Sequence, residues 1–420
     1  MTDAETTDAA SDSTEMAAFR GRARAFLAEH APVRQRRPGD DDRPEPAALS
    51  DVASAKHYQA ALFDAGLAGL TWPLPWGQGL TSEHTRVFNE EAGGRDLPTA
   101  IYTIGLGMVI PTLIEFGTNA QKERYVAKAL RGEEVWSQLF SEPGAGSDVA
   151  SLQMKAERDG EEWVLNGQKV WTTGAQLSDF GAVIARTNVD VPKHRGISMF
   201  IVDFRASGVE IRPLRQMTGG SSFNEVFFND VRVPAANLIG QQDDGWRCAI
   251  AMLMNERVAI GSGGGVGRAG AGGGIKPYLK LARAHGLDED PTVRQALADV
   301  YIRQQVLGYI GQRTRAAMKA GRAPGPEGSI AKLAGALLAR RTSDLAMAIA
   351  GATGQAWTTD DPRGDRWAMA VLSAPASRIA GGTDEIQRNI VGERVLGLPK
   401  DPAVDRELPF KELRVGTQRP

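Results

Sequence analysis

The spacing of apolar residues divides the chain into three zones, and the first has the pattern of amphipathic helices. In residues 16–133, apolar positions such as Phe19 and Ala23 fall on one helical face. A second helix is expected to begin at Ser50, which can cap it, and to end at Gly66, which favours a left-handed stop. The first zone is therefore predicted to be an all-α domain.

The second zone, residues 134–242, has short apolar runs separated by turn residues. Asp159-Gly160 and Asn166-Gly167 are pairs that favour tight turns, so "EEWVLNGQKVW" is expected to be a hairpin. The runs "GISMFIVDF" and "EVFFNDVRVP" add further strands. This zone is predicted to be a compact β domain, an antiparallel barrel or sandwich.

Helical spacing returns in the third zone, residues 243–400. Two of its helices have an apolar face, formed by Val293, Leu297, Val300, Leu307 and Ile310 in one and by Ile330, Leu333 and Leu337 in the other. Several such helices predict a bundle. Residues 1–15 are expected to be a disordered acidic tail, and residues 401–420, which contain prolines and show little periodicity, an extended one.

The composition favours a protein that acts on small molecules. In its 420 residues, 49 Lys and Arg nearly balance 51 Asp and Glu, which leaves no broad charged field for nucleic acid or an anionic membrane. No apolar run reaches the roughly 18 residues of a membrane span, and the N-terminus resembles neither a signal nor a transit peptide, so we expect a cytoplasmic protein. The single cysteine, Cys248, excludes an intramolecular disulfide and is either structural or a nucleophile. No metal site is expected.

A glycine-rich run, "NERVAIGSGGGVGRAGAGGG" at residues 255–274, contains a G-x-G-x-x-G pattern at Gly265, Gly267 and Gly270. A dinucleotide-binding loop would follow a buried strand and open a helix, whereas the spacing before this run is helical and no strand follows it. A flexible linker and a continuing helix are the alternatives. A helix would need tertiary packing here, because each glycine costs about 1 kcal/mol relative to alanine.

The β zone contains two segments that can carry chemistry. In "QLFSEPGAGSDVASL", a Gly-Ala-Gly turn can present successive backbone N–H groups to an oxygen-rich ligand, although it can also be an ordinary loop. In "KVWTTG", Trp171 offers a flat apolar surface and Thr173 a hydroxyl group. The ordinary role of a strand tryptophan is core packing.

Five segments, in this order, resemble the acyl-CoA dehydrogenase family: "SEPGAGSD", "LNGQKVWTTG", "FNDVRVPAANLIG", the helix with "NERVAIG", and "AGGTDEIQRNIVGERVLGLP". The resemblance covers nearly the whole chain. It implies an N-terminal helical domain, a middle β domain and a C-terminal four-helix bundle, assembled as a homotetramer or homodimer. It also implies an FAD enzyme that oxidises an acyl-CoA thioester to the trans-2-enoyl-CoA and passes electrons to an electron-transfer flavoprotein.

The resemblance further implies roles for particular residues. The flavin ring is expected against Gln138, Phe140, Ser141, Trp171 and Thr173, and Ser147 at the pantetheine arm or the FAD pyrophosphate. The FAD phosphates and adenine are expected near Arg283, Gln295, Gly351, Gly354, Thr383 and Glu385, partly across a subunit boundary. Leu253, Arg257, Gly381 and Gly382 are expected, with Ser147, at the substrate. Two departures concern the adenine side: "ARAHGLDEDP" replaces an Arg-Lys-x-Phe-Gly segment, and Ala348 stands where a glutamine is usual.

The family chemistry explains why a carboxylate is needed. A base removes an α-proton while hydride leaves the β-carbon for the flavin, so base and flavin grip the acyl chain from opposite sides. Many members carry this glutamate in a Tyr-Glu-Gly-Thr turn, but here that turn reads "IAGGT" and has Gly381 at the position. A minority, including isovaleryl-CoA and long-chain types, carry it where this chain has Glu256. We therefore predict Glu256 as the base, and the alternative is a merely solvated glutamate.

On this interpretation the glycine run continues the catalytic helix. Gly261, Gly263, Gly264 and Gly265 remove side chains over about one turn beyond the base. They either let a neighbouring helix approach closely or leave room for a bulky acyl group, branched or cyclic.

Two rival functions use the same fold. One is an oxidase or flavin monooxygenase whose reduced flavin meets oxygen. The other is a non-catalytic subunit that binds acyl-CoA, against which Glu256 argues.

Overall fold

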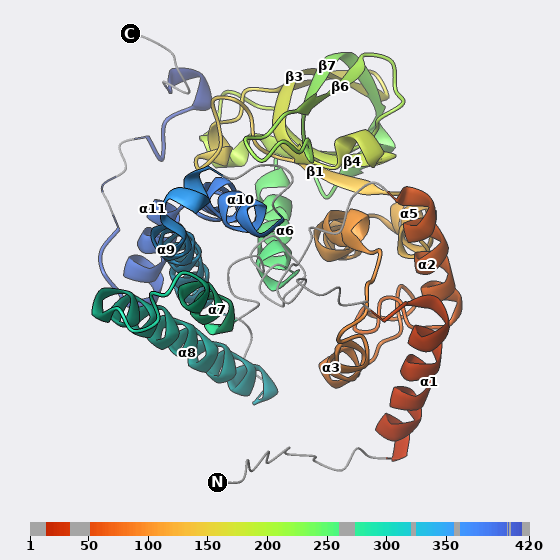
Figure 1. The fold of residues 1–420 in the computed structure, drawn as a ribbon. Coiled ribbons are helices and arrows are strands. Elements are labelled where there is room, and N and C mark those ends of the chain that lie inside the picture. Colours follow the sequence, from red (N-terminus) through yellow and green to blue (C-terminus); the bar gives the residue numbers. More distant parts are fainter. Residues whose placement is uncertain are drawn as a thin grey trace.

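A computed structural model describes residues 14–33, 51–259, 274–320, 325–356, 362–400, 402 and 405–413. Figure 1 shows the N-terminal helices and the C-terminal helices on opposite sides of a central helix, α6, with the β domain lying across them. The predicted order of helical domain, β domain and helical bundle is confirmed. Within the described residues, none of the helices combines the length and the apolar character that crossing a membrane requires.

The N-terminal domain is helical, and its first helix buries the predicted face through Phe19, Ala23 and Leu27. The second helix is capped by Asp51 rather than Ser50: the Asp51 carboxylate accepts a 2.9 Å hydrogen bond from the Ser54 N–H, and Ser50 lies outside the described residues. The elements are α1 (Thr14–His30), α2 (Val52–Asp64), α3 (Ser82–Glu91), the π-helical turn η2 (Gly105–Val109), α4 (Ile110–Phe116) and α5 (Asn119–Leu130). Gly66 has a φ of 66°, as a left-handed stop after α2 requires.

The β domain is one eight-stranded sheet in the order β6-β7-β3-β2-β4-β5-β8, with β1 paired to β4. Its strands are β1 (Trp136–Leu139), β2 (Lys155–Asp159), β3 (Glu162–Thr173), β4 (Phe180–Arg186), β5 (Ile197–Asp203), β6 (Val209–Leu214), β7 (Phe223–Pro234) and β8 (Leu238–Ile239). Most pairs are antiparallel as predicted. Two pairs are parallel, however: β1 with β4, and β2 with β4 through Lys155 and Arg186.

One of the two predicted turns is wrong. Asp159-Gly160 does connect β2 to β3, but Asn166-Gly167 lies inside the twelve-residue strand β3. There the pairing of β3 with β7 shifts register, and the Asn166 side chain bonds Asp230 on β7 through two hydrogen bonds of 2.8 and 2.9 Å. A Cβ at Gly167 would lie only 2.9 Å from Met154, so this glycine permits the residue just before β2 to approach closely within a bulge.

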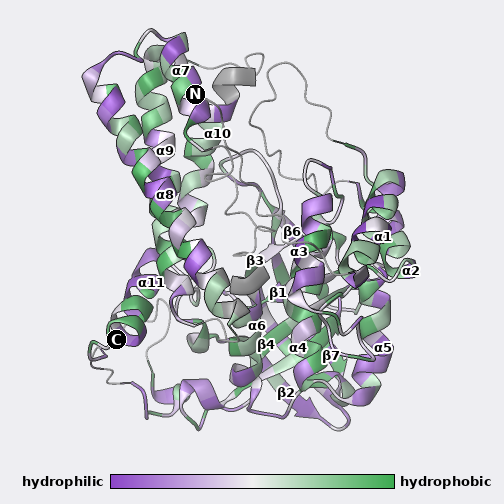
Figure 2. Cartoon of the chain, turned by 90° about the horizontal axis from the view of Figure 1, so that it is seen from below, coloured by the Kyte–Doolittle hydropathy of each residue, from purple (hydrophilic) through white to green (hydrophobic). Residues whose placement is uncertain are grey.

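The C-terminal zone contains α6 (Gly245–Ala259), α7 (Lys276–Ala284), α8 (Pro291–Lys319), α9 (Gly328–Gln355), α10 (Pro362–Ser377) and α11 (Asp384–Ile390). Helices α8 and α10 both pack against α9, and Figure 2 shows hydrophobic and hydrophilic residues alternating along α8 and α9. The predicted face of α8 is buried at Leu297 and Val300. On α9 the prediction was wrong by one position, because Leu337 is 38% exposed while Ala336 and Leu338 are buried.

Candidate functional site

Two of the predicted flavin segments lie side by side where β1 ends and β3 ends. The Ser137 hydroxyl donates to the Thr173 carbonyl at 2.9 Å, and the Val170 N–H donates to the Ser141 carbonyl at 2.9 Å. These bonds bring Gln138, on β1, and the residues that follow it next to the C-terminal end of β3. Five predicted flavin contacts therefore lie close together where the C-terminal ends of β1 and β3 meet: Gln138, Phe140, Ser141, Trp171 and Thr173. This meeting of the two strand ends is named the β1 and β3 edge.

Trp171 is not a core residue. Its backbone is left-handed, with a φ of 60°, and the pairing of β3 with β7 is interrupted between Lys169 and Thr172. The irregularity exposes 60% of Trp171, whose ring makes an edge-to-face contact with Phe223 at 5.8 Å between centroids. An uncovered indole ring of this kind suits contact with a flat aromatic ligand.

The "SEPGAGSD" segment forms a tight turn followed by an exposed loop. Glu142 and Ala145 exchange two backbone hydrogen bonds of 3.0 Å, so the Ala145 N–H is already used. Gly146 and Ser147 are exposed, and nothing lies within 4 Å of where a Gly146 Cβ would be. The backbone that remains open to a ligand therefore starts at Gly146 and does not include the Ala145 N–H of the Gly-Ala-Gly turn.

The loop is fastened by a C-terminal segment that the sequence analysis treated as an extended tail. The Lys193 ammonium bonds Asp148 at 2.9 Å and Asp405 at 2.7 Å. The Phe410 ring packs under the guanidinium of the buried Arg186, 3.7 Å from ring centre to Cζ. No sequence motif joins these distant residues, so this docking could not be predicted.

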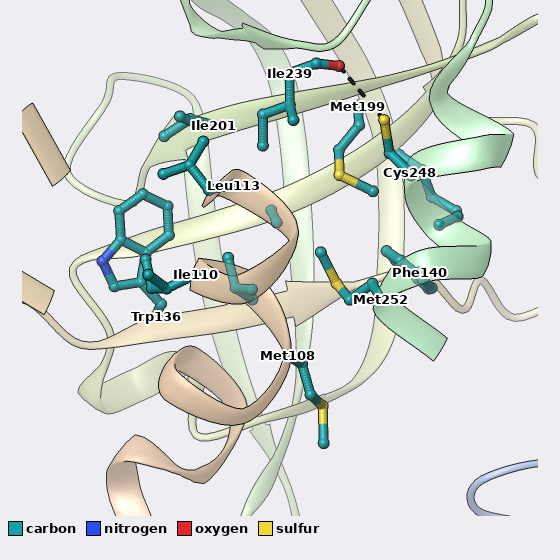
Figure 3. Packing of buried hydrophobic residues seen from close by; sticks show 14 of the residues in the cluster. Met108, Ile110, Leu113, Trp136, Phe140, Met199, Ile201, Ile239, Cys248 and Met252 are labelled. Carbon is teal, nitrogen blue, oxygen red and sulfur yellow. Dashed lines mark hydrogen bonds between the residues drawn. The ribbon is translucent and has the colours of Figure 1, made fainter. Parts of the chain in front are cut away.

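The helix with the predicted base, α6, packs against β5, η2 and α4. Its Met252 belongs to the same buried cluster as Phe140, and Figure 3 shows the two side chains next to each other. Position 256 follows Met252 by one helical turn, so the backbone that carries Glu256 runs close to the Phe140 segment. Leu253 is partly buried against this cluster, whereas the side chains of Glu256 and Arg257 are outside the described set.

The second candidate position for the base is a glycine turn between α10 and α11. Gly381 and Gly382 have φ values of 67° and 93°, which a side chain would strain. The Gln387 amide donates to the Gly381 carbonyl at 2.8 Å, and the Lys332 ammonium donates to the Gly382 carbonyl. The turn is thus firmly held, and it offers backbone groups but no carboxylate at residue 381.

The residues predicted around the FAD phosphates and adenine lie on bundle helices. Arg283 is on α7, Gln295 on α8, Gly351 and Gly354 on α9, and Thr383 and Glu385 at the start of α11. Gly351 breaks α9 with a φ of 57° and a ψ of −133°, and Thr383 caps α11. Figure 1 shows α7 and α8 well apart from β3, so within one chain Arg283 and Gln295 lie away from the flavin-ring segments.

Sequence reasoning missed two charged residues at the centre of the flavin-ring segments, Glu142 and Lys169. They form a buried ion pair, with the Lys169 ammonium 2.8 Å from a Glu142 carboxylate oxygen. The available signal was a lysine inside an otherwise apolar stretch of strand, "KVW", because a buried lysine needs a partner.

Cys248 is a packing residue, buried in the cluster that contains Met252 (Figure 3). Burial raises the pKa of its thiol from the usual value to about 11. We predict that native protein at pH 8 does not react with a thiol-specific disulfide reagent, whereas protein unfolded in guanidinium chloride takes up one equivalent, counted by absorbance. Stoichiometric labelling of the native protein would contradict this prediction.

The raised pKa of the Cys248 thiol also makes stability depend on pH. Because the thiol pKa is higher in the folded than in the unfolded protein, the free energy of unfolding should fall as pH rises from about 9 toward 11.

Three models of acyl-CoA dehydrogenase domains match the chain: the N-terminal domain at residues 13–133, the middle domain at 137–231 and the C-terminal domain at 243–396. The chain therefore belongs to the acyl-CoA dehydrogenase family, whose members depend on FAD, and it is an acyl-CoA dehydrogenase.

Similar proteins agree with this assignment. The chain is 39% identical to acyl-CoA dehydrogenase IpdE1 of Mycobacterium tuberculosis, over 82% of this chain and 88% of that protein. It is 37% identical to acyl-CoA dehydrogenase FadE34 of the same organism, over 85% of this chain, but it spans only 49% of that longer protein. Among solved structures, the Tcur3481-Tcur3483 steroid ACAD superposes with a TM-score of 0.74 at 26% identity, covering 93% of this chain and 99% of that one.

Proposed function

We propose that the chain oxidises an acyl-CoA to the trans-2-enoyl-CoA with FAD bound at the β1 and β3 edge, and that an electron-transfer flavoprotein receives the electrons. The observation that carries this proposal is the apposition of three elements: the Phe140–Ser141 segment, the exposed Trp171 with Thr173, and α6. FAD, when bound, supplies the acceptor for the hydride. The fit rests on the uncovered Trp171 ring beside two hydrogen-bonded strands.

The chain's own residues account for the remaining steps. Glu256 removes the α-proton, and the apolar Met252 and Leu253 one turn earlier on α6 keep water from that part of the helix. The thioester oxygen gains negative charge as the proton leaves, and the backbone N–H at Gly381 is proposed to donate to it. Leu253, Arg257 and Gly382 contact the acyl-CoA, and the exposed Ser147 meets its pantetheine arm or the FAD pyrophosphate.

The assembly is proposed to be a homotetramer or homodimer in which a neighbouring chain helps to hold the FAD phosphates and adenine. This arrangement explains why Arg283 on α7 and Gln295 on α8 lie well apart from the flavin-ring segments on β1 and β3. The similar steroid ACAD carries two component names, so a mixed assembly is the competing outcome. Light scattering of the purified chain gives its oligomeric state, and FAD titration of the same species tests whether it holds the cofactor. An oligomer of this chain alone that binds no FAD would contradict the proposed homo-oligomer and favour a mixed assembly.

Anaerobic titration with a panel of acyl-CoAs tests the function. We expect purified protein to be yellow, to release FAD on denaturation, and to bleach with its acyl-CoA substrate without oxygen. Added electron-transfer flavoprotein should then restore the yellow colour, and mass spectrometry should find an enoyl-CoA two mass units lighter than the substrate. Faster reoxidation by oxygen than by the flavoprotein would indicate an oxidase instead, and protein that binds acyl-CoA without bleaching would indicate a non-catalytic subunit.

The glycines after Glu256 yield a prediction about substrate width. Gly261, Gly263, Gly264 and Gly265 lie outside the described residues. The prediction therefore rests on the sequence and on the similar structure, which is named a steroid ACAD. If these glycines leave room for a wide acyl group, Gly264→Leu should lower kcat/KM for cyclic acyl-CoAs at least about tenfold more than for butyryl-CoA, because filling a pocket excludes only the larger ligand. Gly264→Ala is the matched control. Equal losses for both substrates would favour close helix packing as the role of the glycines.

A further inference from the structure

A buried ion pair joins the two flavin-ring segments from beneath. Lys169, on β3, has no exposed surface, and its ammonium donates to the Glu142 carboxylate at 2.8 Å and to the Phe140 carbonyl at 3.1 Å. One side chain from the strand that carries Trp171 therefore holds both the turn after β1 and the backbone of a predicted flavin contact.

The carboxylate of Glu142 extends this connection to a third strand. It accepts hydrogen bonds from the N–H groups of Gln153 at 2.7 Å and Met154 at 3.0 Å, immediately before β2 begins. Glu142 and Lys169 thus join the turn after β1, the start of β2 and the middle of β3 at a single buried point. Burial lowers the pKa of Lys169, and the charge of Glu142 opposes that shift.

The position of this pair in the strand is the informative feature. The next residue, Val170, bonds Ser141, and the register of β3 with β7 then breaks between Lys169 and Thr172. Trp171 takes up its left-handed backbone within this break. The ion pair therefore holds β3 at the last regular residue before the strand turns the indole ring outward.

We propose that Glu142 and Lys169 are positioning residues that fix the Phe140–Ser141 segment and the Trp171–Thr173 segment at the separation that the flavin ring requires. Neither acts on the reacting atoms, because both side chains are buried. This inference rests on the proposed FAD site. A purely stabilising pair would change how tightly the domain folds but would leave the two segments correctly placed in every molecule that remains folded.

The experiment compares Lys169→Met with Leu165→Ala, a matched control. Leu165 is also fully buried on β3, but it packs in a different hydrophobic cluster from Phe140, and it makes none of the hydrogen bonds that join the two flavin-ring segments. Both variants are expected to unfold at lower temperature than the wild type. Apoprotein is titrated with FAD well below each unfolding midpoint. Lys169→Met should bind FAD at least about tenfold more weakly than wild type, and Leu165→Ala within about twofold of it, because ligand binding depends on exact placement of the contacting groups.

Hydrogen exchange of the apoprotein provides a readout that needs no cofactor. Amides of residues 137–141 and 170–174 should exchange faster in Lys169→Met than in Leu165→Ala when both are measured equally far below their unfolding midpoints. Loss of the Lys169–Glu142 ion pair is expected to loosen those two segments before the rest of the domain. Equal exchange in the two variants would overturn the positioning role.

A double variant, Lys169→Met with Glu142→Gln, covers the case in which the single variant does not fold. Removing both charges leaves no unpaired buried ion, so stability should recover in part. FAD affinity should stay low if the pair positions the segments, and return with stability if the pair only stabilises. Wild-type protein that binds no FAD would contradict the proposed function instead, so the two failures are distinguishable.

Discussion

Replacing Glu256 by glutamine should lower the rate of flavin reduction by acyl-CoA about a thousandfold or more, while FAD remains bound. Glutamine has nearly the shape of glutamate but lacks the basic lone pairs, so the α-proton has no acceptor. Position 256 lies one turn beyond Met252, which shares a buried cluster with Phe140. Stopped-flow absorbance under anaerobic conditions measures the reduction, and the visible spectrum reports bound FAD.

The control for this variant is Glu161→Gln, which removes a carboxylate whose side chain is 95% exposed and lies in the turn between β2 and β3. It should reduce at the wild-type rate. Near-normal flavin reduction in Glu256→Gln would exclude Glu256 as the base. Another residue would then have to remove the α-proton, because the Gly381 turn supplies no carboxylate at the other family position.

Local patterns predicted much of the architecture. The face of α1 at Phe19 and Ala23 and the turn at Asp159-Gly160 depend on residues close together in the chain, where spacing and turn preference act directly. Asn166-Gly167 has the same turn preference, but β7 pairs with β3 on both sides of it, and Met154 packs against the glycine. Tertiary pairing overrode the local preference, and the dipeptide forms a bulge instead.

The candidate site was predictable as segments but not as an arrangement. Motifs pointed to Phe140, Ser141, Trp171 and Thr173, and the structure brings these residues together. What holds them is not visible in the sequence, because Lys169 and Glu142 are 27 positions apart and their contact depends on how the segment after β1 lies against β3. The two departures on the adenine side lie on the bundle helices: residues 282–291 run from the end of α7 to the start of α8, and Ala348 is on α9.

The second large effect is expected at Trp171. Its 60% exposure on a strand that is otherwise well bonded leaves an aromatic surface open to the ligand. Covering such a ring is worth about 1.5–3 kcal/mol, so Trp171→Ala should weaken FAD binding about ten- to a hundredfold. Because the ring contributes little to the core, the unfolding temperature of the apoprotein should change little.

Two variants separate a flavin contact from a general surface effect. Trp171→Phe retains an aromatic ring beside Phe223 and should lose less affinity than Trp171→Ala. Met217→Ala removes another apolar side chain, 66% exposed, in the same domain and should bind FAD as the wild type does. Isothermal titration of apoprotein with FAD gives all three affinities, and the flavin absorbance band reports the polarity around the ring. If Trp171→Ala kept both the wild-type FAD affinity and the wild-type spectrum, the exposed indole would not contact the flavin. The flavin ring would then have to lie at another position along the β1 and β3 edge.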